Sequence, residues 1–437
     1  MRSKNIAIFL DGTWNQVDDY TNVYLMYQLC KGIEVGTQAL AENEQYKDIT
    51  QIKYYDPGVG TGIGNLSPVL IGGAIGLGLK HNVAQAYLSI CRHYNPGDKI
   101  YIYGFSRGAY TARTLAGLLY TFGVLSDRYV IPNKSLPLWP LTALARNKDL
   151  KFAKKAIDTL RELRGMHPEM VKELANNFKS KYCKESSDNG IEIEFMGLFD
   201  TVGSLGIPSV LDPFKKANRK KTLTRRHTRN FLHRNKMPNA NFPRNIKNAC
   251  HALAVDEYRL HFVPTLWNDI PEAANVEQRW FTGAHSNIGG GYPNNLLSNK
   301  PLYWIYQQSN SHDLELADFM APHEDVHLDE PISDSFAGFR KPYKLFGIQE
   351  HYRPIYFKSE TGAQDDSSLK SQTIDDSVFE RIRFDTEYRT QNLMRLSDAD
   401  QEQLFYNKLG FDKKLSQRLK NKNKQLLPTT KKGVSND

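Results

Sequence analysis

Apolar positions in the first 300 residues form short runs rich in β-branched and aromatic residues. Four such runs lie at 6–10, 52–55, 100–105 and 191–199. Runs of this length are typical of strands, and those with few polar interruptions are typical of strands buried on both faces of a parallel sheet. We also expect a strand at 260–263 and a short strand that ends at Gly283.

Segments with the apolar spacing of amphipathic helices separate these runs. They lie at 25–33, 82–93, 109–119 and 248–259, and a further helical segment extends from residue 302 to about 320. Strands that alternate with helices predict an α/β fold, with a mostly parallel central sheet and helices on both faces.

From residue 126 to 187 the pattern becomes helical and charged, which predicts an inserted helical cap above the sheet. A solvated helical decoration fits the same pattern. We predict one domain over residues 1–395, which contains the cap at 126–187 and a basic loop insertion at 214–247. A basic, partly disordered tail follows at 396–437.

Positive charge is concentrated in one stretch of the chain. The formal net charge is +9, and residues 214–236 hold ten lysines and arginines and no acidic residue. Such a stretch either docks on an anionic surface or forms a solvated loop. Between Arg219 and Lys236 this stretch has one aromatic residue, Phe231. Binding of single-stranded nucleic acid uses several aromatic side chains on which bases stack, so the composition argues against it. We expect peripheral contact with an anionic membrane and no nucleic-acid partner.

Other sequence features exclude several classes of protein. The four cysteines form no Cys-x-x-Cys pair, so neither a zinc site nor a disulfide framework is indicated. The first apolar run is too short for a signal-peptide core. The longest apolar segment, 69–79, is well short of the roughly 20 residues that span a bilayer. We expect a protein that is cytoplasmic in the producing cell, without a transmembrane segment; export without a cleaved signal peptide stays open.

The most informative stretch is 98–109, where an apolar run leads through Gly-x-Ser-x-Gly into a helical pattern. This order predicts the strand, sharp turn and helix of a nucleophile elbow, with Ser106 at the turn. Gly104 and Gly108 would let the strand and the helix pass closely. The backbone N–H of Arg107, at the helix N-terminus, would stabilise an oxyanion. A tight glycine-rich turn with a capping serine is the alternative.

A second loop that we associate with the site follows the first apolar run. We expect a backbone N–H near Gly12 to supply the second oxyanion donor, with Asp11 ordering the loop; a simple Asp-Gly turn is the alternative. The glycines at 58–64 do not have the spacing of a dinucleotide fingerprint. We interpret them as a flap that continues into residues 71–79, and we expect neither a cofactor nor a metal.

Acidic and imidazole side chains follow later strands. Asp200 comes directly after the run at 191–199, and His285 lies on a loop two residues after Gly283. The chain order serine, aspartate, histidine is that of an α/β-hydrolase-like triad. His251 and Asp256 are fallback members of the triad, with mainly structural roles.

Five motifs together resemble a known family. They are Phe9-Leu-Asp-Gly-Thr13, Gly104-Phe-Ser-Arg-Gly-Ala109, Phe199-Asp-Thr-Val-Gly203, His251-Ala-Leu-Ala-Val-Asp-Glu-x-Arg259 and Gly283-x-His-Ser-x-x-Gly-Gly-Gly-Tyr292. In this order they resemble the α/β-hydrolase domain of the type VI secretion lipase effectors and their uncharacterised bacterial relatives. The resemblance implies a phospholipase or related esterase, with Ser106, Asp200 and His285 on the triad positions. Asn287 stands where the family often has an aspartate.

These observations predict a serine hydrolase that cleaves carboxylic esters through an acyl-enzyme, with membrane phospholipids as substrates. An esterase for a small soluble ester and a non-catalytic module that binds anionic surfaces are the alternatives. An immunity or secretion partner is an expectation that the resemblance adds.

Overall fold

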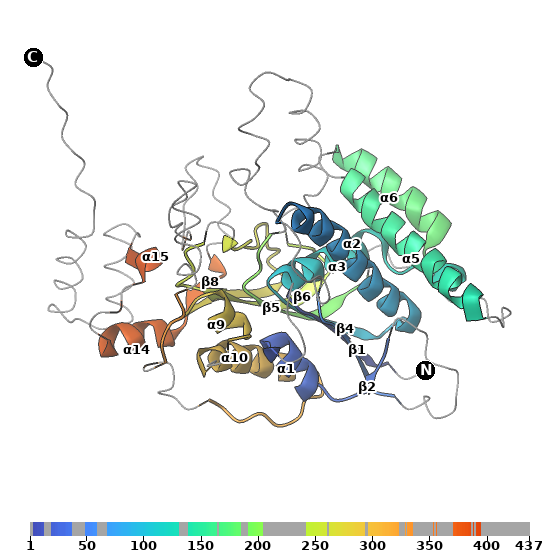
Figure 1. Ribbon diagram of the computed structural model, residues 1–437. Coiled ribbons are helices and arrows are strands. Elements are labelled where there is room, and N and C mark those ends of the chain that lie inside the picture. Colours follow the sequence, from blue (N-terminus) through green and yellow to red (C-terminus); the bar gives the residue numbers. More distant parts are fainter. Residues whose placement is uncertain are drawn as a thin grey trace, which may run out of the picture.

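Parallel strands form the centre of the protein, as the apolar runs predict (Figure 1). They are β1 (Asn5–Leu10), β2 (Ile33–Glu34), β3 (Gln51–Asp56), β4 (Lys99–Phe105), β5 (Ile193–Phe199), β6 (Ile246–Ala254), β7 (Asn275–Phe281) and β8 (Gln372–Ile374). The eight strands pair in the order β2-β3-β1-β4-β5-β6-β7-β8, and each neighbouring pair is parallel. The expected α/β fold class is therefore confirmed.

This computed structural model describes a defined part of the 437-residue chain. The described residues are 3–12, 19–36, 49–58, 68–130, 139–163, 166–184, 191–203, 242–259, 262–292, 296–322, 328, 330–334, 353, 355, 370–385, 388 and 390–394. The basic stretch 214–236, the tail 396–437 and most of the glycine-rich segment 58–64 lie outside them. None of the helices in the described ranges combines the length with the apolar composition that a membrane-spanning segment needs.

Helices cover both faces of the sheet. They are α1 (Asn22–Leu29), α2 (Pro68–His93), α3 (Arg107–Phe122), α4 (Asp127–Val130), α5 (Trp139–Glu162), α6 (Pro168–Tyr182), α9 (His285–Gly289), α10 (Asn299–Asn310), α14 (Asp376–Phe384) and α15 (Gln391–Met394), with a short 3-10 helix, η4 (Leu296–Ser298). In Figure 1, α2 and α3 lie on one face and α1, α9 and α10 on the other.

Side-chain alternation along the central strands β1 and β4 contributes residues to two separate cores, one on each face of the sheet. In β1, Ile6 and Ile8 pack toward α2 and α3, whereas Ala7 and Phe9 pack toward α1 and α10. β4 alternates in the same way. Because a fully buried aliphatic or aromatic side chain contributes about 1.5–3 kcal/mol, burial on both faces anchors these two strands at the centre of the sheet.

The helices expected at 126–187 form an outer layer over α2 and α3 (Figure 1). Phe178 of α6 packs against Phe122 of α3, with ring centroids 4.5 Å apart, and Ile157 of α5 belongs to the same core. These helices are thus packed onto the domain. A role for them as a cap over the substrate route stays a prediction, as do the domain boundaries.

One predicted helix is a strand. Most of the segment 248–259 belongs to β6, although its alanines and leucine favour a helix. β6 pairs with β5 on one side and β7 on the other, and this pairing and burial override the local preference. Of the strand expected at 260–263, residues 262 and 263 are described, and they lie outside any strand.

The stretch 71–79, interpreted above as part of a flap, is helical instead. It belongs to α2, which begins at Pro68 and runs without a break to His93. Proline is favourable in the first turn of a helix, because its missing N–H would have no helical acceptor there.

Helix ends also differ from the prediction, and the helix expected at 25–33 ends at Leu29, since Ile33 belongs to β2. α1 begins at Asn22, because the hydroxyl of Thr21 accepts the backbone N–H of Tyr24 at 3.1 Å and caps the helix. The helix expected from residue 302 to about 320 ends at Asn310.

Candidate active site

The candidate site lies where the strand order reverses. β1 pairs with β3 on one side and β4 on the other, and the register aligns Leu10 with both Asp56 and Gly104. The carboxyl ends of these strands therefore meet at one edge. In open α/β sheets, the crevice at such a reversal is where ligands bind.

Ser106 occupies the turn between β4 and α3. Its backbone has φ 56° and ψ −117°, a left-handed conformation that costs a residue with a side chain about 1–3 kcal/mol. Bonds on both sides hold the turn, since the N–H of Ser106 donates to Phe199 O at 3.0 Å and its carbonyl accepts Val202 N–H at 3.3 Å. The turn thus presents the hydroxyl beyond the sheet edge.

The glycines that flank the serine permit this close turn. A methyl group at Gly104 would lie 2.6 Å from the Cα of Ala109, and one at Gly108 would lie 2.1 Å from the carbonyl oxygen of Leu10. Both separations are far below a van der Waals contact, so α3 approaches β1 and β4 only because these positions lack a side chain.

The structure brings Ser106, His285 and Asp200 together. His285 Nε2 lies 2.8 Å from Ser106 Oγ, and His285 Nδ1 lies 2.5 Å from Asp200 Oδ2. All three side chains are buried. This arrangement can move a proton from the hydroxyl to the imidazole while the carboxylate fixes the ring.

His285 is the first residue of α9 rather than part of a loop, and packing fixes its ring. The ring lies between Phe105 and Phe262, with a centroid separation of 4.7 Å from each. Gly289 permits α9 to approach, because a methyl group there would lie 2.0 Å from the Phe105 ring. Of the three glycines after His285, Gly289 thus serves close packing beside the elbow.

Burial and charge set the protonation states of the two titratable partners. Burial lowers the pKa of His285, although the neighbouring Asp200 acts to raise it. Burial acts to raise the pKa of Asp200, but the guanidinium of Arg353 and the hydrogen bond with His285 hold it well below its usual range. A neutral imidazole beside an ionised carboxylate is the state that a general base requires.

The loop after β1 is ordered by Asp11, which is 2% exposed. Its carboxylate accepts the N–H of Gly12 at 2.7 Å, the hydroxyl of Tyr55 at 2.8 Å and the hydroxyl of Thr21. The amide of Gly12 therefore points to this carboxylate, and its part in an oxyanion hole stays a prediction. Arg107 is the first residue of α3, so its N–H has no acceptor within the helix.

The fallback residues His251 and Asp256 form hydrogen bonds with backbone groups next to the candidate triad. His251 Nε2 accepts the N–H of Thr201 at 3.0 Å, and burial, with Arg113 nearby, lowers the pKa of His251 to about 3. Asp256 accepts the N–H of Gly283 at 2.8 Å. These bonds position the loops that carry the candidate triad.

Sequence reasoning missed two groups around the site. Arg353 binds both oxygens of Asp200, at 2.6 and 2.8 Å, and no local pattern around residue 353 points to this role. Glu257 accepts the N–H of His285 at 3.2 Å and pairs with Arg259 at 2.8 Å. Glu257 and Arg259 belong to a motif of the family resemblance, which was the available signal.

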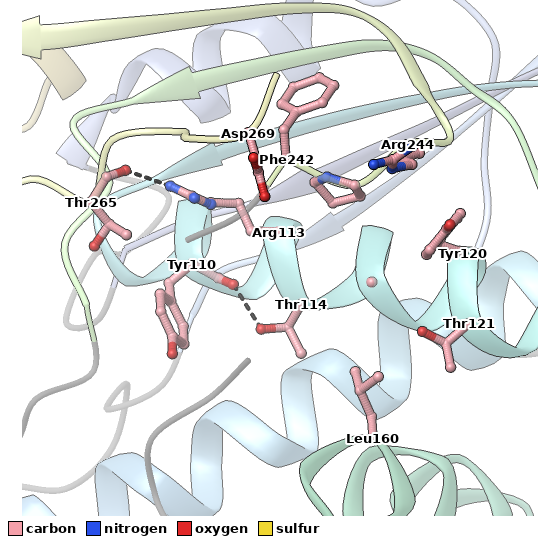
Figure 2. A pocket seen from close by; sticks show the side chains of 12 residues that line it. Tyr110, Arg113, Thr114, Tyr120, Thr121, Leu160, Phe242, Arg244, Thr265 and Asp269 are labelled. Carbon is pink, nitrogen blue, oxygen red and sulfur yellow. Dashed lines mark hydrogen bonds between the residues drawn. The ribbon is translucent and has the colours of Figure 1, made fainter. Parts of the chain in front are cut away.

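A pocket of about 340 Å³ lies beside α3, and Leu160 of α5 is among the residues that line it (Figure 2). Tyr110, Arg113 and Thr114 line it from α3, and Thr265 and Asp269 line it from the segment before β7. The guanidinium of Arg113 donates to the carbonyl of Thr265 across it. None of the triad candidates lines this pocket. Among the described residues, no group of three acidic, histidine or cysteine side chains could hold a metal ion.

The parallel sheet and the strained serine between β4 and α3 define an α/β-hydrolase fold. Residues 4–308 match the model of the family described as T6SS, Phospholipase effector Tle1-like, catalytic domain. The chain belongs to this family, which confirms the resemblance drawn from its motifs. Membership of this family supports a lipase or esterase function, and both are hydrolase activities.

Other known proteins are similar over part of their length. An uncharacterised protein of Saccharomyces cerevisiae is 30% identical over 219 residues, which are 47% of this chain and 27% of that protein. A solved Tle1 effector bound to the VgrG spike of the type 6 secretion system is 22% identical, with a TM-score of 0.31, over 67% of this chain and 52% of that chain. Esterase 2 of Thermogutta terrifontis is 11% identical, with a TM-score of 0.28, over 73% of this chain and 86% of that chain. The chain therefore spans about a quarter of the yeast protein and about half of the effector.

Proposed function

We propose that this protein is a serine hydrolase that cleaves carboxylic esters, with membrane phospholipids as its substrates. The observation that carries the proposal is the position of His285, which is hydrogen-bonded to Ser106 on one ring nitrogen and to Asp200 on the other. Family membership supports the ester and phospholipid chemistry.

In the first half of the reaction, His285 Nε2 removes the proton of Ser106 as Oγ attacks the ester carbonyl carbon. Asp200 keeps the other ring nitrogen protonated and stabilises the imidazolium. The tetrahedral intermediate then collapses: the bond to the alcohol breaks, and the alcohol leaves with the proton from His285. The acyl group remains on Ser106.

In the second half, His285 removes a proton from water, and the resulting hydroxide attacks the acyl carbon. The bond to Ser106 Oγ breaks, the serine regains its proton from His285, and the carboxylic acid leaves. The N–H of Arg107 and an N–H of the loop near Gly12 stabilise the oxyanion in both halves. Asp11 supports this loop, and Gly104 and Gly108 support the turn of Ser106.

Ser106→Ala tests the mechanism. We expect kcat to fall by about 10³-fold or more, because the acyl-enzyme has no oxygen on which to form, and we expect labelling by a fluorophosphonate probe to be lost. Ser309→Ala is the matched control, because Ser309 is also a buried serine and is hydrogen-bonded to Tyr103, but lies in α10. Full esterase activity in Ser106→Ala would contradict the mechanism.

The substrate class needs a separate test. The protein is given vesicles of mixed zwitterionic and anionic phospholipids or, separately, a soluble chromogenic ester. The vesicle samples are analysed for released fatty acid, lysolipid and headgroup. Hydrolysis of vesicles supports the phospholipid proposal and identifies the bond that is cut. Hydrolysis of the soluble ester alone would support an esterase for small substrates, and vesicle binding without hydrolysis or labelling would support a binding module.

A further inference from the structure

Arg353 meets the candidate triad from outside the part of the chain that defines the family. The family match ends at residue 308, and Arg353 lies 153 residues beyond Asp200. Its side chain is nevertheless almost fully buried, with 1% of its surface exposed, directly against the Asp200 carboxylate. A residue of the C-terminal region thus closes one side of a site built by the family domain.

The guanidinium of Arg353 is held in one orientation. Nη1 donates to Asp200 Oδ1 at 2.6 Å and Nη2 to Asp200 Oδ2 at 2.8 Å, the two-pronged geometry that arginine forms with carboxylates. The same nitrogens also donate to the carbonyls of Ala254 at 2.9 Å and Phe262 at 2.6 Å. These four bonds fix the plane in which Asp200 must lie.

The backbone of Arg353 is held as well. Its N–H donates to the side-chain oxygen of Asn392 at 2.7 Å, and the amide nitrogen of Asn392 donates to the carbonyl of Val255 at 2.6 Å. Val255 directly follows β6. A continuous series of hydrogen bonds therefore leads from the end of β6 through Asn392 and Arg353 to Asp200, and from there to His285 and Ser106.

We propose that Arg353 is a positioning residue of this site: its guanidinium keeps the Asp200 carboxylate ionised and aimed at the His285 ring. The inference rests on the proposed function. A buried carboxylate without a cation tends to take up a proton, and a protonated Asp200 would no longer hold the His285 tautomer that accepts the serine proton. Arg353 prevents this through both carboxylate oxygens, one of which, Oδ2, also contacts the ring of His285.

The pH profile reports this role. Among the described residues, the charged or titratable groups around the Asp200–His285 pair are Arg353, Glu257, Arg259 and His251. Loss of the guanidinium raises the pKa of Asp200, because burial is then no longer opposed, and the pKa of His285, because a positive neighbour is removed. In the pH profile of kcat/KM, the acid limb is the region where activity falls toward low pH. Both changes move this limb to higher pH.

Arg353→Met removes the charge and the two-pronged donor at similar length. We expect kcat/KM on a soluble chromogenic ester to fall by about 10²- to 10³-fold, mainly in kcat, with the acid limb shifted upward. Arg353→Lys keeps the charge but loses the two-pronged donor. Its activity should therefore lie between those of Arg353→Met and the unchanged protein, with an acid limb close to that of the unchanged protein. A folded Arg353→Met variant with an unshifted limb and full kcat would overturn the inference.

Arg381→Met is the matched control. Arg381 is also a buried arginine of the C-terminal region; it donates to the carbonyl of Glu330 at 2.7 Å and stacks on Tyr388. Its loss should lower the melting temperature without moving the acid limb. An equal shift in Arg381→Met would mean that loosening of the C-terminal region causes the effect, which would also overturn the inference.

Asn392→Ala provides a second route if Arg353→Met does not fold. It leaves the guanidinium in place but removes the bond that holds its backbone, so we expect a several-fold loss and a smaller upward shift of the limb. An unchanged profile in Asn392→Ala together with full activity in Arg353→Lys would count against positioning. Ser106→Ala is measured in parallel: activity that survives it refutes the proposed function, whereas serine-dependent activity with an unchanged Arg353→Met profile refutes only this inference.

Discussion

The turns that follow β5 and β6 carry one buried aspartate each, and the two differ in charge environment. Asp200 accepts the N–H of Ala254, at the end of the next strand, at 3.0 Å. Asp256 accepts the N–H of Gly283, beyond the end of β7, at 2.8 Å. Both carboxylates thus tie their turn to the neighbouring strand. Asp200 in addition binds a guanidinium, whereas Asp256 accepts from neutral groups such as the hydroxyl of Tyr388, at 2.9 Å.

The pKa values of the two aspartates separate accordingly. Burial acts to raise both, but Arg353 holds the pKa of Asp200 well below its usual range, while the pKa of Asp256 stays raised. The comparison teaches that location at a strand end and burial do not make a carboxylate fit for catalysis. A guanidinium and an imidazole that bond the carboxylate directly distinguish the candidate catalytic acid from the structural one, whose pKa stays raised although Arg381 acts to lower it.

The largest expected difference between the two turns is in activity. Asp200→Asn should lower kcat/KM by about 10⁴-fold, because the amide favours the wrong tautomer of His285. Asp256→Asn should lower it by less than about tenfold, because Asp256 touches only the supporting turn. Steady-state kinetics on a soluble ester, with folding checked by circular dichroism, measure both. Similar losses in the two variants would remove the distinction.

The next difference is in stability at neutral pH. Asp200→Asn leaves the guanidinium of Arg353 buried without its anion, which should lower the free energy of unfolding by about 3–5 kcal/mol. Asp256→Asn replaces a carboxylate by an amide among neutral donors, and it should change the free energy of unfolding by less than about 1 kcal/mol. Urea unfolding of the two variants provides the comparison. A greater loss in Asp256→Asn would contradict the charge environments described above.

A smaller difference appears in the pH dependence of unfolding. The pKa of Asp256 is raised in the folded protein, so its contribution to stability is fully present below about pH 4, the ordinary value of an unfolded aspartate. That contribution is lost as the pH rises through the folded pKa. Asp256→Asn should therefore gain stability relative to the unchanged protein as the pH rises, by about 1.4 kcal/mol for every pH unit that separates the unfolded and folded pKa values. Urea unfolding at a series of pH values measures this gain, and a relative loss would show that the pKa is not raised.

The smallest expected effect on activity belongs to Tyr388→Phe. The variant removes a hydroxyl that donates to Asp256 Oδ2, and leaving a buried acceptor with one donor fewer should cost about 1–2 kcal/mol of unfolding free energy. Activity should stay within about threefold, because Asp256 does not touch the reacting groups. Thermal unfolding and kcat/KM together test the variant. A large loss of activity without unfolding would place the turn after β6 in the reaction.

Local patterns allowed much of the fold to be predicted from sequence. Strands β1, β3, β4 and β5 were visible because buried parallel strands are short apolar runs, and Ser106 was visible because a strand, a tight glycine turn and a helix are contiguous in the chain. β6 was mispredicted, because its alanines and leucine favour a helix unless strands lie on both sides.

The sequence by itself determined the α/β class, the turn at Ser106 and, through chain order, Asp200 and His285 as the candidates for its partners. Only the tertiary structure decided that these three side chains lie within hydrogen-bonding distance and that His251 and Asp256 do not join them. It alone also decided that Arg353 meets Asp200. The physical reason is range: turn and strand preferences act between neighbouring residues, whereas a buried ion pair across 153 residues leaves no periodic trace in the chain.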